Sequence, residues 1–173
     1  MNKSNTIIVD ADACPKVIKD ILYRAVARLQ INMILVANQP LAIPKSKYIK
    51  SIVVGAGFDV ADRYIIDITT PGDLIITADI PLAAAVVKKE GIALNPRGEL
   101  YTKNNINEKL SIRNLMDEIR GTGQLTGGPS PLTNKDNQKF ANALDSFLAK
   151  KYGEAICKMY YTLNEGETRI FKI

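Results

Sequence analysis

Thr6-Ile7-Ile8-Val9-Asp10-Ala11-Asp12 is the stretch that decides the fold. Its first four residues are β-branched and apolar, which is typical of a strand that is buried on both faces. Pro15 then suits the first turn of a helix, and apolar residues recur at helical spacing from Ile18 to Leu29. A buried strand that leads directly into an amphipathic helix predicts the first unit of an α/β fold.

The same alternation continues along the chain. It predicts strands at residues 33–37, 52–54, 74–77 and 92–94, and helices at 59–66, 81–90 and 106–120, the last with Leu110, Leu115 and Ile119 facing inward. Prolines between residues 38 and 50 predict an irregular segment there. This order of elements predicts a mainly parallel sheet with helices on both faces.

The last third of the chain predicts a helix and a terminal extension. Thr133 and Asp136 resemble a capping box, so we expect a helix from there to about Lys151. Tyr160 to Leu163, a turn at 164–167 and Thr168 to Ile173 predict a β-hairpin. We therefore place one α/β domain at residues 1–151 and an extension at 152–173. Gly127-Gly128-Pro129 is either a lid over the site or a plain linker.

Composition narrows the chemistry. The 173 residues carry a formal net charge of +5, which is either a mild preference for polyanions such as RNA or an ordinary solvated surface. The chain has no histidine, which excludes Ser-His-Asp and Cys-His catalysis and His-ligated zinc. Cys14 and Cys157 are too far apart in sequence to form a metal-binding motif. No apolar run is long enough to cross a membrane, so we expect a cytoplasmic protein.

Acidic residues follow two of the predicted strands. Asp10 and Asp12 come directly after the first strand, and Asp79 follows the strand at 74–77. Because ligands bind outside the carboxyl ends of parallel strands, these carboxylates are candidates for one catalytic and metal-binding site that holds Mg²⁺ or Mn²⁺. The alternative is structural: Asp12 and Asp79 would cap helices, and Asp10 would bond to a neighbouring loop.

Other residues are weaker candidates for the same site. Asp62 is a further metal ligand, with Asp59 and Thr77 as additional members; the alternative for the two acids is a solvated helix start. Three basic residues are candidate contacts to substrate phosphates, although each is also consistent with ordinary surface charge: Lys16, Arg63 and Arg97. Cys14 lies beside the acidic pair, which would raise its pKa, so we do not expect it to be a nucleophile.

Several segments resemble the YaiI/YqxD family of uncharacterised bacterial proteins. They are Ile8 to Pro15, Gly57 to Asp62, Gly72 to Ala83, Gly127 to Pro129 and Phe140 to Asp145. That family resembles a branch of the PIN-like superfamily, whose members are typically metal-dependent ribonucleases. The resemblance implies a Rossmann-like three-layer sandwich. It also implies that Asp10, Asp79 and either Asp62 or Asp59 are the superfamily's acids, with Asp12 an addition of this family.

Three functions are compatible with these patterns. The first is a divalent-metal-dependent ribonuclease or phosphodiesterase. The second is a phosphatase of the haloacid dehalogenase type, which also opens with a strand and Asp-x-Asp; Asp10 would be its nucleophile and Asp12 its general acid. The third is a non-catalytic RNA-binding module with a metal site. The extension at 152–173 is either a local elaboration or a contact between copies of the chain.

Overall fold

The computed structural model describes residues 6–57, 59–122 and 130–167, and the main chain alone for 154–167. Six strands form one sheet in the order β3-β2-β1-β4-β5-β6, parallel except for β6. The strands are β1 Ile7–Asp10, β2 Met33–Ala37, β3 Ile49–Val53, β4 Leu74–Ile76, β5 Ile92–Leu94 and β6 Leu100–Tyr101. The helices are α1 Lys16–Leu29, α2 Val60–Ile68, α3 Ile80–Lys88, α4 Ile106–Gly121 and α5 Asn134–Glu167.

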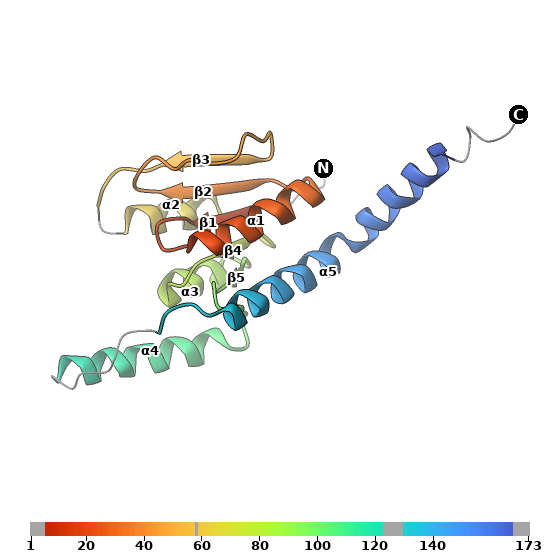
Figure 1. Cartoon of the computed structure of the whole chain (residues 1–173). Coiled ribbons are helices and arrows are strands. Elements are labelled where there is room, and N and C mark those ends of the chain that lie inside the picture. Colours follow the sequence, from red (N-terminus) through yellow and green to blue (C-terminus); the bar gives the residue numbers. More distant parts are fainter. Residues whose placement is uncertain (1–5, 58, 123–129, 168–173) are drawn as a thin grey trace, which may run out of the picture.

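Two hydrophobic cores lie on the two faces of the sheet, which confirms the three-layer sandwich. Successive side chains of a strand point to opposite faces, so Ile7 and Val9 face α1 and α5, whereas Ile8 faces α2 and α3. Phe140 of α5 is fully buried in the first core, and Ile65 of α2 is fully buried in the second. Figure 1 shows the sheet between these two groups of helices.

The strand order places a topological switch point at β1. The chain runs from β1 outward to β2 and β3, and then returns to the other side of β1 to form β4. Val9 of β1 is paired with Leu35 of β2 on one side and with Ile76 of β4 on the other. In open parallel sheets of this kind, ligands bind in the crevice at the carboxyl ends of the strands where the order reverses. The carboxyl ends of β1 and β4 therefore mark the expected site.

The strands at the two edges of the sheet differ most from the prediction. β3 begins at Ile49 rather than Ile52, because Lys50 and Ser51 interrupt its apolar pattern without interrupting its pairing to β2. The connection from β2 to β3 contains no helix in residues 38–48, in agreement with the irregular segment that its prolines predict. β6 was not predicted, because two residues carry too little pattern to indicate a strand.

Helix α4 is less buried than predicted. Its first residue, Ile106, is buried, but Leu115 is 54% exposed and is not an inward-facing residue. Leu110 and Ile119 are half-buried. The reason is geometric: α4 packs against α3 near its start, and Figure 1 shows its later turns extending away from the sheet.

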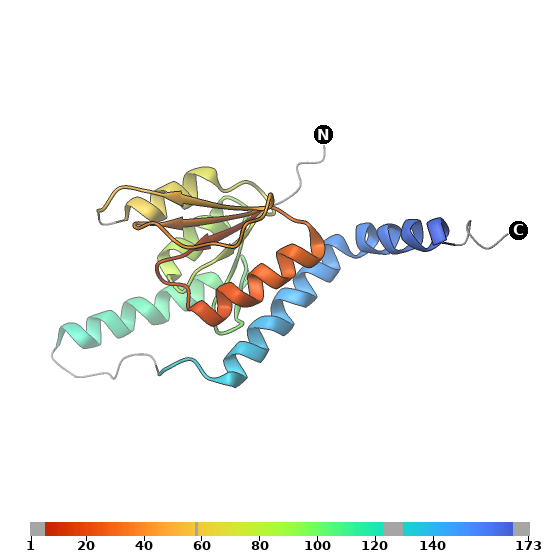
Figure 2. The same ribbon diagram turned by 45° about the horizontal axis from the view of Figure 1, so that its top comes forward.

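The chain end is helical where a hairpin was predicted. α5 is one helix to Glu167, so the expected strand at Tyr160 to Leu163 and the turn after it are wrong. Residues 168–173, the second expected strand, lie outside the described residues, as does Gly127-Gly128-Pro129. Figures 1 and 2 both show the last turns of α5 extending beyond the sheet. None of the helices in the described parts is long and apolar enough to span a membrane.

The start of α5 forms as predicted. The hydroxyl and main-chain N–H of Thr133 both donate to Asp136 Oδ2, at 2.7 and 2.9 Å, and the Asp136 N–H donates back to Thr133 Oγ1 at 3.2 Å. These bonds confirm the capping box and lower the pKa of Asp136. Near the other end of the packed part, Lys151 donates to the carbonyl of Gly72.

Candidate functional site

Asp10 lies in the centre of the candidate site. It is the last residue of β1 and is only 7% exposed. Because it is two residues after Ile8, its side chain faces the same side of the sheet, toward α2 and α3. Its Oδ2 accepts a hydrogen bond from the Thr77 hydroxyl at 3.1 Å. The central strand therefore holds a buried carboxylate at the switch point.

Thr77 connects Asp10 to Asp79. The Thr77 side chain is buried, and its Oγ1 accepts the main-chain N–H of Asp79 at 3.0 Å while its proton is donated to Asp10. Asp79 is the N-cap of α3, and its Oδ1 accepts the N–H of Leu82 at 2.7 Å. Asp79 therefore caps α3, as the structural alternative predicted, and its charge also acts on Asp10; its role as a metal ligand stays a prediction.

The electrostatics show which acids lie near one another. Burial raises the pKa of Asp10, and the nearby carboxylates of Asp12 and Asp79 raise it further, against the hydrogen bonds from Thr77 and from the Ala13 main chain. Burial also raises the pKa of Asp62 to about 6, followed by the charges of Asp79, Asp10 and Asp59. Mutual repulsion of this kind is relieved by a cation or by a proton.

Asp12 is placed differently from the expectation. The expected alignment with Asp10 required an extended segment, but β1 ends at Asp10 and residues 11–13 form a turn. Asp12 is exposed, and its Oδ2 accepts the main-chain N–H of Asn38 at 2.7 Å, at the carboxyl end of β2. It does not cap α1, whose N-cap is Pro15. Asp12 therefore ties the β1 turn to the β2 end at the rim of the site.

The remaining acidic candidates lie at the side or at the opposite edge. Asp59 is exposed, has φ of 59° and makes no side-chain cap to α2. A further aspartate, Asp73, is buried at the amino edge of the sheet. There it accepts hydrogen bonds from Thr6 and Thr70, each at 2.8 Å, which is a structural role.

The candidate phosphate contacts separate into two groups. Lys16 and Arg63 are exposed in the first turns of α1 and α2, the helices that begin at the carboxyl edge. Arg97 is instead bound to the start of α5, through Asp136 at 3.1 Å and the carbonyl of Ser130. The structure therefore leaves Lys16 and Arg63 accessible, while Arg97 already has protein partners.

Sequence reasoning missed Lys19. Its Nζ donates to the carbonyl of Ala11 at 3.2 Å, so it supports the turn that carries Asp10 and Asp12. The available signal was its place one turn into α1, because helical side chains point back toward the N-terminus. Cys14 is buried beside it. Burial, with a contribution from Asp10, raises the pKa of Cys14 to about 12 against the effect of Lys19, which supports the view that it is not a nucleophile.

Carboxylate oxygens are the kind of ligand that a hard divalent cation prefers, but those of the candidate site do not surround a common point. Across the parts of the chain whose side chains are described, no three acidic or cysteine side chains lie together so that they could hold a metal ion. Mg²⁺ usually keeps several waters and binds through one or two carboxylates together with substrate phosphates. Asp10 and Asp79, with Asp62 beside them, match that open arrangement.

Comparisons with known proteins agree on one family. The family described as "Uncharacterized BCR, YaiI/YqxD family" matches residues 8–150. A UPF0178 protein of Dechloromonas aromatica is 58% identical over 144 residues, which is 83% of this chain and 96% of that protein. UPF0178 proteins of Shewanella baltica and Legionella pneumophila are each 56% identical over 83% and 84% of the chain and 96% and 98% of their own length. No solved structure gives a significant match.

Proposed function

The chain belongs to the YaiI/YqxD family, and we propose that it is a divalent-metal-dependent phosphodiesterase of PIN-like type that cleaves single-stranded RNA. The observation that carries the proposal is the Asp10–Thr77–Asp79 connection at the topological switch point. A catalytic site is expected at this place in the fold, and carboxylates that repel one another are the groups that a cation would neutralise.

The chain's own groups limit the mechanism. Without histidine, it has no imidazole to accept a proton from water near neutral pH. A bound Mg²⁺ or Mn²⁺ would lower the pKa of a coordinated water and stabilise charge on the scissile phosphate. Asp10 and Asp79 would hold the ion, with Asp62 at the side. Thr77 would fix the orientation of Asp10, and Lys16 and Arg63 would bind phosphates of the strand.

Neither alternative has a specific observation in its favour. A phosphatase of the haloacid dehalogenase type needs its second aspartate directed to the same substrate as the first, whereas the Asp12 carboxylate holds Asn38. A non-catalytic RNA-binding module would not need two adjacent buried or half-buried acids at the switch point. That alternative remains an explicit outcome of the experiment below.

The test is hydrolysis of labelled single-stranded RNA by the purified full chain. We expect cleavage with Mg²⁺ or Mn²⁺ and none with a chelator. Asp10→Asn and Asp79→Asn should each lower the rate by about 100-fold, the scale of losing one electrostatic stabiliser of the transition state. Both changes keep a hydrogen-bond acceptor, and asparagine is also a good N-cap, so the fold should persist.

The matched control is Asp67→Asn, an exposed aspartate farther along α2. It should cleave like the wild type. Equal cleavage by the wild type and Asp10→Asn would identify a contaminating ribonuclease. Absence of cleavage with all metals and RNAs, together with metal-independent RNA binding, would replace the proposal with the binding-module function.

A further inference from the structure

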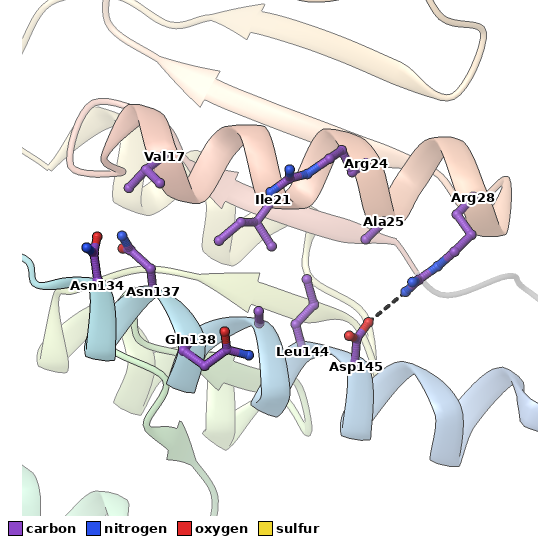
Figure 3. Close-up of a pocket in the computed structure, with 11 residues that line it drawn as sticks. Val17, Ile21, Arg24, Ala25, Arg28, Asn134, Asn137, Gln138, Leu144 and Asp145 are labelled. Carbon is purple, nitrogen blue, oxygen red and sulfur yellow. Dashed lines mark hydrogen bonds and ion pairs between the residues drawn. The ribbon is translucent and has the colours of Figure 1, made fainter.

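A groove lies between α1 and α5, on the opposite face of the sheet from the Asp10 side chain. Its volume is about 470 Å³. Its floor is apolar, with Ile21 of α1 and Leu144 of α5 (Figure 3). Its walls carry arginines from α1 and amide side chains from α5. An amphipathic lining of this kind suits a ligand that has both charged and flat apolar parts.

The groove has one more positive charge than it can neutralise. Arg28 forms an ion pair with Asp145 at 2.6 Å, which closes one end of the groove (Figure 3). Arg24 is one turn earlier on the same face of α1, and no described residue forms an ion pair or hydrogen bond with it. The complement of this surplus is a single negative charge, as a phosphodiester carries.

The groove also has a polar atom without a partner. Asn137 Oδ1 is buried and accepts no hydrogen bond within the described part of the chain. Figure 3 shows the Asn137 side chain directed from α5 toward α1. A buried acceptor without a donor is costly, so a turn of this side chain that brings Oδ1 to a ligand donor in the groove would be favoured. The 2′-hydroxyl of ribose and the N–H groups of bases are such donors.

Both helices begin at the edge of the sheet that carries the acids. α1 starts with Lys16, directly after the turn that follows Asp10. α5 starts with Asn134, held by the Asp136–Arg97 ion pair just beyond the carboxyl end of β5. Because Val17 and Asn134 line the groove, it opens at that edge. Lys16, the residue before Val17, is exposed at the start of α1.

We propose that the α1–α5 groove binds the part of a single-stranded RNA that flanks the cleaved phosphate. This inference rests on the proposed function. Arg24 contacts a phosphate of the strand, Asn137 accepts a hydrogen bond from a ribose or base, and the apolar floor packs against sugar or base faces. No aromatic side chain lines the groove, so phosphate contacts and hydrogen bonds supply most of the affinity.

The experiment is binding of a fluorescent single-stranded oligoribonucleotide to the full chain in a chelator, measured by anisotropy at several salt concentrations. Arg24→Gln should weaken binding by about three- to tenfold and reduce the slope of log K against log salt by about 0.7. Asn137→Asp, which places a negative charge in the groove, should weaken binding at least as much. The same oligomer with deoxyribose should lose less on this change if Asn137 binds the 2′-hydroxyl.

Arg113→Gln is the matched control, with the same charge change on α4, which packs on the other face of the sheet. Equal weakening by Arg24→Gln and Arg113→Gln would overturn the groove, as would adenosine monophosphate binding as tightly as the oligomer. RNA binding that depends on Arg24 without metal-dependent cleavage would keep the groove and refute catalysis. Metal-dependent cleavage in which the Arg24→Gln variant has the same KM as the wild type would keep the catalytic proposal and refute the groove.

Discussion

Thr77 has the most central position of any single residue in the acidic site. Its one hydroxyl donates to Asp10 and accepts from the Asp79 main chain, and it has almost no contact with solvent. A buried hydroxyl with two partners fixes the relative position of both. The distance between the two acids is therefore set by a residue that does not itself carry charge.

Thr77→Val removes these bonds while keeping the shape of the side chain. It leaves Asp10 Oδ2 and the Asp79 N–H without their partner, so we expect the free energy of unfolding to fall by about 1–3 kcal/mol. Thr77→Ser, which keeps the hydroxyl, should lose less. Urea unfolding measures both variants. If Thr77→Val and Thr77→Ser lost the same free energy of unfolding, the hydroxyl of Thr77 would not be the group that stabilises this position.

Asp62 makes the stability of the fold depend on pH. Its pKa in the folded protein is about 6, compared with an ordinary value of 3.8. The folded protein therefore keeps a proton that the unfolded chain has released, and the fold loses stability as the pH rises from about 4 to about 6. We expect Asp62→Asn to be more stable than wild type at about pH 7 and to differ little at about pH 3.

Urea titrations over this pH range, in a chelator, measure the difference. Asp67→Asn is the control from the exposed part of the same helix. Asp10, whose pKa is also raised, should retain part of the pH dependence in the Asp62 variant. A gain from Asp62→Asn that is the same at both ends of the pH range would show that the Asp62 charge is not the cause.

Among the elements, the turn between β5 and β6 packs against the main chain of α5 through one glycine, Gly98. Gly98 has φ of 83°, and a Cβ there would lie 2.5 Å from the main-chain carbon of Lys139 and 2.7 Å from the nitrogen of Phe140. The turn thus contacts the helix backbone directly. Phe140, beside this contact, is fully buried in the core under α1.

Gly98→Ala should therefore be strongly destabilising. The left-handed conformation costs about 1–2 kcal/mol for alanine, and the clash with the backbone of α5 adds about 1–3 kcal/mol. Gly121→Ala is the control, because no atom lies within 4 Å of its added Cβ. Thermal unfolding followed by circular dichroism compares the two. A small effect of Gly98→Ala would mean that α5 can shift away from the turn.

The sequence predicted the central elements best. β2 and β5 were placed to the residue, because apolar runs bounded by turn residues are the clearest pattern for a buried strand. The hairpin was wrong because Tyr160 to Leu163 has high β propensity, and propensity yields to its context. The exposed side of α4 was missed, since periodicity indicates a face but not what covers it.

The sequence could indicate candidate site residues only where they directly follow a predicted strand. Asp10 and Asp79 were chosen because both follow buried strands, and the sheet order makes those strands neighbours. Their role as metal ligands stays a prediction. The position of Asp12 differs from the expectation because the sequence does not show that residues 11–13 form a turn rather than an extended segment. The roles of Lys19 and of the α1–α5 groove depend on contacts between distant segments, which one sequence does not reveal.

For the whole molecule, the question is where the folded domain ends. The family match ends at residue 150, while Lys151 binds Gly72 and Tyr152 packs on the core under α1. α5 continues to Glu167 and extends beyond the sheet (Figures 1 and 2). The part of α5 that packs on the sheet therefore reaches at least Tyr152, and the boundary at residue 151 stays a prediction.

Two truncations test this boundary. A chain that ends at Tyr152 should keep the melting temperature of the full chain to within about 2 °C, whereas a chain that ends at Leu148 should lose about 4–8 °C through the missing Lys151 and Tyr152 contacts. Light scattering of the same proteins measures the oligomeric state. A large loss of stability or of association in the chain that ends at Tyr152 would assign residues 153–173 to an interface between copies.

The strand at the middle of the sheet precedes its two neighbours in the chain, so the ribosome makes it before either of them. A nascent chain that ends before residue 74 can pair β1 with β2 and β3, but the other edge of β1 has no partner yet. An apolar strand with an open edge is a template for incorrect pairing, so this interval is the hazardous part of biosynthesis. Pairing with β4 covers this edge of β1 and brings Thr77 to Asp10, and β4 then has the free edge until β5 pairs with it. The central strand gains its second partner and the acidic site is assembled in the same step.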